Sequence, residues 1–72
     1  MNQLELEYAR RRKGKTKEDM AALIGKSLVS YGKKERGEVS FSDDEKVIVA
    51  RELDLTPEQV NAIFFDGNLP YR

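Results

Sequence analysis

The sequence predicts an all-α fold of five short helices, and three observations favour it. Capping signals recur along the chain. At each of them a serine or threonine stands just before a charged or apolar run, which is the place of the residue that caps the start of a helix. No stretch alternates apolar and polar residues as a half-buried strand would. The segments between the predicted helices are at most six residues long, which favours neighbouring helices in one compact body.

We expect these helices to form one domain over residues 1–66, because neither a repeat nor a long linker divides the chain. Residues 67–72 contain glycine and proline and are predicted to be an irregular tail. A chain of 72 residues buries only about 60% of the surface that it exposes when unfolded, so the predicted core is small.

The first two predicted helices are charged and short. Residues 3–13 place Leu6 and Ala9 on one stripe, and a glycine ends the run. Thr16 stands three residues before an aspartate, so it can cap a second helix, which ends at Gly25.

The remaining three helices have equally clear starting signals. Ser27 can cap a third helix over about residues 28–36, which a glycine follows. The sequence SDDE at 42–45 is a capping box for a fourth helix, and TPEQ at 56–59 is a second box with proline at the first helical position. We expect the fifth helix to run through about Phe65.

Composition excludes several classes of site. There is no cysteine and no histidine, which removes disulfides, the usual zinc sites, thiol nucleophiles and imidazole bases. Acids and arginines interrupt the first residues where a signal peptide needs an apolar run, and no later stretch could span a membrane. We therefore expect a cytoplasmic protein with no cofactor, no metal, no evident small-molecule ligand and no enzymatic activity.

The acids of the SDDE box are interpreted as complementing the helix dipole, with acid–base or metal chemistry as the alternative.

Charge is divided unevenly, although the net charge is zero. Residues 1–37 hold ten basic and five acidic side chains, whereas residues 38–72 hold three basic and eight acidic ones. Such an asymmetry indicates either a polyanionic partner for the first half or a merely solvated basic surface.

The second and third predicted helices, separated by a short turn with glycine, have the spacing of a helix-turn-helix. The stretch TKEDMAALIGKS at 16–27, continued by ERG at 35–37, resembles the lambda-repressor/Cro-like helix-turn-helix family, also called the XRE family. The matching positions, in register and without a gap, are Thr16, Met20, Ala21, Gly25, Ser27, Glu35, Arg36 and Gly37. The likeness covers nearly the whole chain, and a tyrosine in the third helix with KERG makes it most similar to short phage or prophage regulators. It implies a five-helix lambda-repressor-like DNA-binding domain.

The resemblance also implies which residues would reach base edges. The corresponding positions are Leu28, Val29, Gly32 and Lys33. Because leucine and valine cannot donate hydrogen bonds, they would touch thymine methyl groups or simply fill space, and direct readout would depend on Lys33, Ser30 and Ser27. Glycine inside a helix lowers helix stability by about 1 kcal/mol relative to alanine. Gly32 is therefore interpreted in two ways: it lets the backbone lie close to DNA, or it is a neutral substitution in a short helix.

Phosphate contacts are expected from the basic residues nearest the turn, of which about half would meet DNA. The set comprises Lys13, Lys15, Lys17, Lys26, Lys33, Lys34 and Arg36. Lys17, Lys26 and Lys33 are the first choices, and Arg36 is included in the predicted interface. Most relatives carry glutamine where this chain has Lys17, which can hold a phosphate by charge but cannot also accept a hydrogen bond.

Two further interpretations follow from the resemblance. Arg10 and Glu35 stand where an ion pair commonly joins the first and third helices, so we expect a structural pair. Tyr31 is interpreted as a core residue whose hydroxyl reaches the edge, with stacking on a base as the alternative. Outside the motif, the end of the chain has more apolar side chains than so small a core can bury. This excess predicts a dimer contact through Phe65, Leu69 and Tyr71.

Together these observations predict a sequence-specific regulator that binds double-stranded DNA at an operator as a homodimer, most simply as a repressor. The alternative is a helix-turn-helix fold that binds a partner protein and no DNA, as an antirepressor or assembly factor would. The apolar pair Leu28 and Val29 and the zero net charge favour that alternative.

Overall fold

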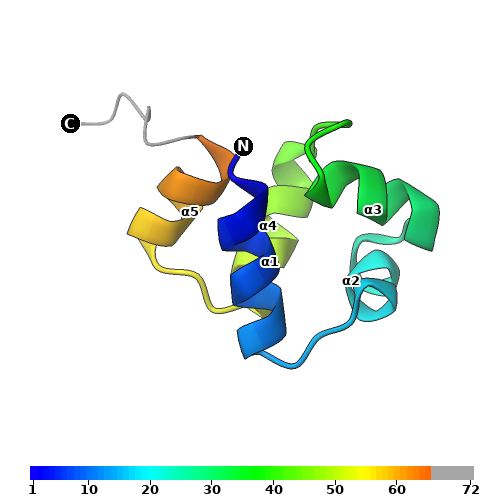
Figure 1. The fold of residues 1–72 in the computed structure, drawn as a ribbon, viewed down its shortest axis with the longest axis horizontal. Helices are drawn as coiled ribbons and strands as arrows, with labels where there is room; N and C mark the ends of the chain where they lie inside the picture. The colour runs from blue at the N-terminus through cyan, green and yellow to red at the C-terminus, as the bar shows by residue number, and fades with distance from the viewer. Residues whose placement is uncertain (66–72) are drawn as a thin grey trace.

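The computed structural model describes residues 1–65, which contain five α-helices and no strand. The helices are α1 (Gln3–Arg12), α2 (Lys17–Ile24), α3 (Leu28–Glu35), α4 (Asp43–Glu52) and α5 (Pro57–Phe64). Figure 1 shows α2 and α3 together at one end of the molecule and α5 at the other end. The all-α prediction with five short helices is therefore confirmed.

Each helix begins at a side chain that accepts a hydrogen bond from the backbone of its first turn. The five capping residues are Asn2, Thr16, Ser27, Ser42 and Thr56. In α2, α4 and α5 the third helical residue also bonds back to the cap, which completes a capping box. Four of these caps were predicted. Asn2 was missed, although asparagine is among the preferred residues at this position.

Three helices end one residue earlier than predicted. The expected last residues Lys13, Arg36 and Phe65 are the C-caps of α1, α3 and α5, with ψ angles of 2°, −5° and 7°. A ψ near zero tightens the last turn, where the carbonyl groups lack partners inside the helix. The boundary therefore differs only in this final turn.

The core takes residues from all five helices, and a chain of three aromatic rings runs through it from α3 to α5. The ring of Phe41, which lies between α3 and α4, meets the Tyr31 and Phe64 rings edge-on at centroid distances of 6.1 and 5.5 Å. The burial of Phe41 was not predicted, although an apolar residue just before a helix cap often packs inward. The core consists of Leu6, Ala9, Met20, Ala21, Ile24, Tyr31, Phe41, Val49, Leu53, Ile63 and Phe64.

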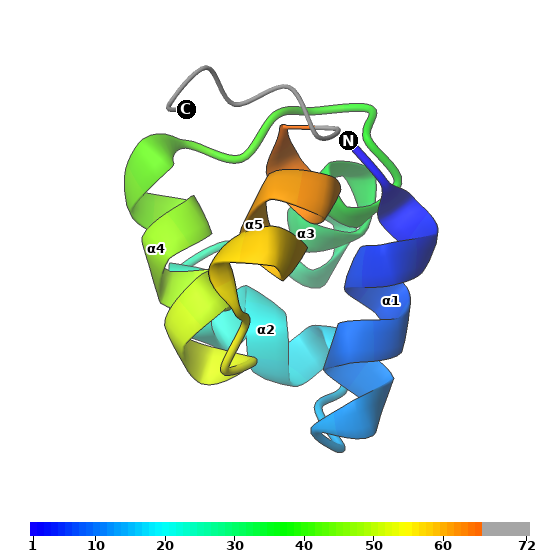
Figure 2. The same cartoon turned by 90° about the vertical axis from the view of Figure 1, so that its left-hand side faces the viewer.

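Helix α3 packs against two other helices, α1 and α2. Helix α2 packs on both α3 and α4, and α1 packs on α5 and α3. Figure 2 shows α1 and α4 on either side of α5, with α2 and α3 behind it. The start of the chain is tied to this body because the Asn2 N–H donates to the Ile63 carbonyl at 2.9 Å. One side of α3 is consequently buried and the other is left outside.

Candidate nucleic-acid interface

The turn between α2 and α3 is sharp because Gly25 takes a left-handed conformation. Its φ of 70° is reached by glycine without the steric cost that a side chain would add. The next N–H, from Lys26, donates back to the Ala21 carbonyl at 2.9 Å. Ser27 then caps α3, since its Oγ accepts from the Ser30 N–H at 3.1 Å. These local bonds set the angle at which α3 leaves α2.

The inner face of α3 is joined to α1 by a buried ion pair. Arg10 Nε donates to Glu35 Oε1 at 2.8 Å, and the Arg10 guanidinium also donates to the Lys15 carbonyl at 2.9 Å. The Tyr31 hydroxyl donates to the same Glu35 oxygen at 2.9 Å. Three side chains from two helices thus share one buried network, at the positions where a structural pair was expected.

Tyr31 belongs entirely to the core, which corrects part of its interpretation. Its side chain is fully buried, so the hydroxyl does not reach the edge and the ring cannot stack on a base. Burial, followed by the charge of Glu35, raises the pKa of the Tyr31 phenol above its ordinary value. The phenol therefore stays protonated and keeps donating to Glu35.

A second buried ion pair joins α3 to α4. Lys34 Nζ donates to Glu45 Oε1 at 2.9 Å and to the Ser40 carbonyl at 3.0 Å. Lys34 was counted among the surface cations near the turn, and this was wrong, because it is 7% exposed. Its place three residues after Tyr31 puts it on the inner side of the helix, which is the signal that could have identified it.

Glu45 has a larger role than a first-turn acid. Its Oε1 accepts from both Lys34 and the Ser42 N–H. Burial raises the pKa of the Glu45 carboxyl, but the hydrogen bonds from Ser42 and Lys34 outweigh that effect and leave the pKa below its ordinary value. Glu45 therefore stays ionised, caps α4 and fixes the end of α3 at the same time.

The outer face of α3 presents apolar and cationic side chains to solvent. Val29 is 68% and Leu28 is 44% exposed, and Lys33 is exposed one turn beyond Val29. At 3.6 residues per turn, positions 29 and 33 lie on nearly the same side of the helix, opposite Tyr31. Ser30, at the side of this face, is partly buried.

Gly32 and Arg36 lie against each other on this helix. Gly32 is buried, and a Cβ added there would lie 3.2 Å from Nη1 of Arg36. The Arg36 side chain is itself exposed and pairs with Glu38 at 2.6 Å. A contact between Gly32 and DNA would require the Arg36 guanidinium to move, so this contact stays a prediction.

The structure separates the basic residues near the turn into paired and unpaired groups. Lys17 begins α2, Lys26 lies in the turn, and Lys33 lies on α3. None of these three makes an ion pair with any residue in the part of the chain that the structure describes. By contrast, Lys13 and Lys15 lie 3.8 and 4.0 Å from carboxylates of Asp54 and Glu52. The unpaired set coincides with the first choices for phosphate contacts.

The predicted dimer contact lies only partly within the described residues. Phe65 is partly buried, and the Lys46 ammonium lies 4.7 Å from the centre of its ring. Leu69 and Tyr71 fall outside residues 1–65, so the dimer contact stays a prediction.

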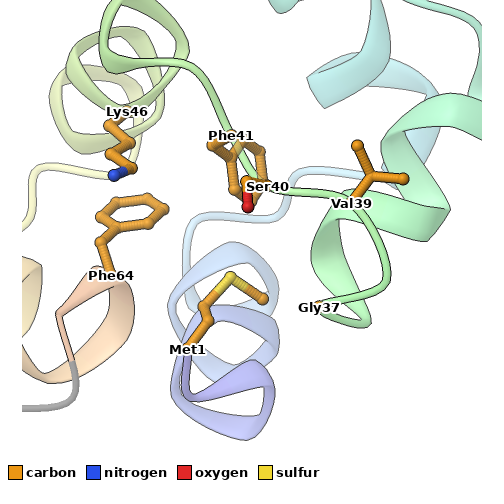
Figure 3. Close-up of a pocket in the computed structure, with 7 residues that line it drawn as sticks. All are labelled: Met1, Gly37, Val39, Ser40, Phe41, Lys46 and Phe64. Carbon is orange, nitrogen blue, oxygen red and sulfur yellow. The ribbon is translucent and has the colours of Figure 1, made fainter.

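A small pocket lies between the start of the chain, the α3–α4 segment and α5. Figure 3 shows Lys46 and Phe64 on one side, Val39 and Gly37 on the opposite side, and Met1 below. Its volume of about 190 Å³ is below the roughly 300–1,000 Å³ of typical ligand sites.

Among residues 1–65, no three potential metal ligands come together, and no helix has the length and apolar character to cross a bilayer.

Comparison with known proteins assigns the arrangement to a family. The helix-turn-helix family model HTH_3 matches residues 6–60, which extend from α1 into α5. No curated protein and no solved structure matches the chain.

Proposed function

This chain belongs to the lambda-repressor/Cro-like helix-turn-helix family, and on that premise we propose that it is a sequence-specific repressor that binds operator DNA. The family consists of DNA-binding transcriptional regulators, so the proposal concerns the finer role. The chain is similar to short phage regulators in the tyrosine of its third helix and in the sequence KERG. This similarity supports a repressor of phage or prophage type that acts in the cytoplasm.

One observation carries the proposal. The inner face of α3 is fastened by two buried ion pairs, Arg10–Glu35 and Lys34–Glu45, while its outer face is left exposed. A helix that is fixed on one side and bare on the other is suited to enter a groove as a rigid element. Three lysines that form no ion pair among residues 1–65 surround it, and they are available for phosphates.

The mechanism follows from this arrangement. Helix α3 would lie in the major groove, with its first residues toward base edges, while α2 crosses the backbone. Lys17, Lys26 and Lys33 would bind phosphates and fix the register of the helix on the duplex. Two copies would occupy two half-sites about one helical turn apart, and the occupied operator would exclude the transcription machinery from the promoter.

Titration of a fluorescent duplex of random sequence tests whether the lysines bind DNA phosphates. We expect binding at low salt that weakens steeply as salt rises, because each neutralised phosphate contributes about −0.9 to the slope of log K against log salt. Lys17→Ala should make this slope shallower by about 0.9. Arg51→Ala is the matched control, since it removes the same charge from the last turn of α4 and should leave the slope unchanged.

Selection of binding sites from a random duplex pool tests the specific part. A recovered consensus with two half-sites would support a dimeric operator-binding protein. Lys33→Ala should weaken binding to that consensus more than Arg51→Ala does, and equal effects would reject the proposed docking of α3.

The rival function is a protein-interaction module with the same fold. The exposed Val29 and Leu28 on α3 favour it, because apolar side chains are also suited to a protein partner. Absence of binding to any duplex at low salt would overturn the DNA proposal and favour this module.

A further inference from the structure

We propose that Val29 and Leu28 recognise the methyl groups of thymines, so that the operator half-site is specified largely by apolar contact. This inference rests on the proposed function, because it concerns the same helix in the same groove. It adds the chemical class of base that the helix selects.

The outer side of α3 presents few hydrogen-bonding groups to base edges. The Ser27 Oγ is held at the helix cap by the Ser30 N–H and keeps one hydroxyl donor, and the Arg36 guanidinium pairs with Glu38. Ser30 is partly buried at the side of the face. Lys33 is the remaining exposed cation on this helix, and it is without an ion pair among residues 1–65. A single ammonium is a point charge and lacks the planar fork that reads guanine most selectively.

Apolar side chains fill the rest of this face. Val29 is its most exposed apolar side chain at 68%, and Leu28 precedes it at 44%. In the major groove, thymine is distinguished from the other bases by its C5-methyl group, which apolar side chains contact. Contact with methyl groups therefore offers these two residues a way to discriminate between base pairs.

The side chain of Val29 and the helix that carries it are both held rigidly. Valine in a helix holds one side-chain rotamer about nine times in ten, so the two methyl groups of Val29 keep one direction. The helix itself is held by the buried pairs to α1 and α4. A preorganised apolar surface loses little conformational entropy when it meets a methyl group. Discrimination by shape is consequently favoured at this position.

Replacing thymine by deoxyuridine removes the methyl group and leaves the base-pairing groups unchanged. With the consensus duplex recovered from the random pool, each thymine of a half-site is replaced in turn, and the dissociation constant is measured by fluorescence anisotropy. We expect at least one replacement to weaken binding about fourfold, which corresponds to one apolar carbon group removed from water.

Alanine variants of the two apolar residues assign the effect to α3. Val29→Ala and Leu28→Ala should each fold normally, since both side chains are exposed, which circular dichroism checks. Each should reduce the preference for thymine over deoxyuridine at the position that the replaced side chain contacts, because alanine keeps less apolar surface for the methyl group. Lys33→Ala is the control, because it should weaken binding to both duplexes and leave their ratio unchanged.

The outcomes separate this inference from the function on which it rests. A consensus that is bound specifically, but with no sensitivity to deoxyuridine at any position, would overturn the methyl recognition and leave the operator-binding function standing. Sensitivity that is undiminished in both Val29→Ala and Leu28→Ala would overturn the assignment to these two residues. A pool that yields no consensus would overturn both proposals.

Discussion

Replacing Arg10 with methionine is expected to remove a large part of the stability of this domain. The Arg10–Glu35 pair is closed at 2.8 Å, with side-chain exposures of 7% and 6%. Without the guanidinium, the carboxylate stays buried, and the Tyr31 hydroxyl is its remaining donor among residues 1–65. Breaking a buried ion pair by removing one partner costs about 3–5 kcal/mol, because the other charge is left uncompensated.

That loss is large on the scale of the whole chain. A domain of this length is stable by about 4–11 kcal/mol, at about 0.05–0.15 kcal/mol per residue. The variant should therefore lose at least a quarter of its free energy of unfolding and up to all of it. Urea titration followed by circular dichroism measures the change, and with a slope of about 1 kcal/mol per molar urea the midpoint should fall by about 3 M or more.

The neighbouring arginine provides a matched control. Arg11 pairs with Glu7 at 2.7 Å, but its side chain is 69% exposed, and exposed pairs contribute at most about 1 kcal/mol. Arg11→Met should therefore change the midpoint little. The double variant Arg10→Met/Glu35→Met should be more stable than Arg10→Met alone, since it leaves no buried lone carboxylate. Equal losses in Arg10→Met and Arg11→Met would refute the reasoning, as would a double variant that loses the sum of its two single changes.

Two further predictions concern α3 and its support. Gly32→Ala should raise the free energy of unfolding by about 1 kcal/mol through helix propensity, because the added Cβ meets a movable arginine end at 3.2 Å; a destabilised variant in urea titration would contradict this. The lowered pKa of Glu45 means that its contribution to stability is present above its ordinary pKa of 4.5 and is lost as pH falls through the lowered value. Between pH 7 and pH 3 the parent should consequently lose more stability than Glu45→Gln, and parallel losses would count against the prediction.

Local signals were sufficient to predict where most helices begin. A cap such as Thr16 or Ser42 acts on backbone groups within three residues of itself, so its effect can be inferred from neighbouring letters alone. The same holds for Gly25, which supplies a positive φ at the turn. The resemblance added the DNA-binding domain type and the contact between Arg10 and Glu35, two residues that are 25 positions apart in sequence.

Lys34 is the cation near the turn whose surface placement was wrong. Lys34 and Lys33 are adjacent in sequence and chemically identical, yet one is buried against Glu45 and the other is exposed. Helical spacing from Tyr31 indicates which side of α3 each lysine takes, but only the position of α4 decides that Lys34 meets a carboxylate there. Phe41 was likewise missed because its burial depends on two rings from distant segments.

By itself, the sequence determined the all-α class, the helix starts and the turn that makes a helix-turn-helix, because these depend on contacts between residues close along the chain. Only the tertiary structure decided which cations are paired, which face of α3 is bare and where the Tyr31 hydroxyl donates. Those properties arise when helices distant in sequence bring carboxylates, carbonyls and rings to within hydrogen-bonding or van der Waals distance.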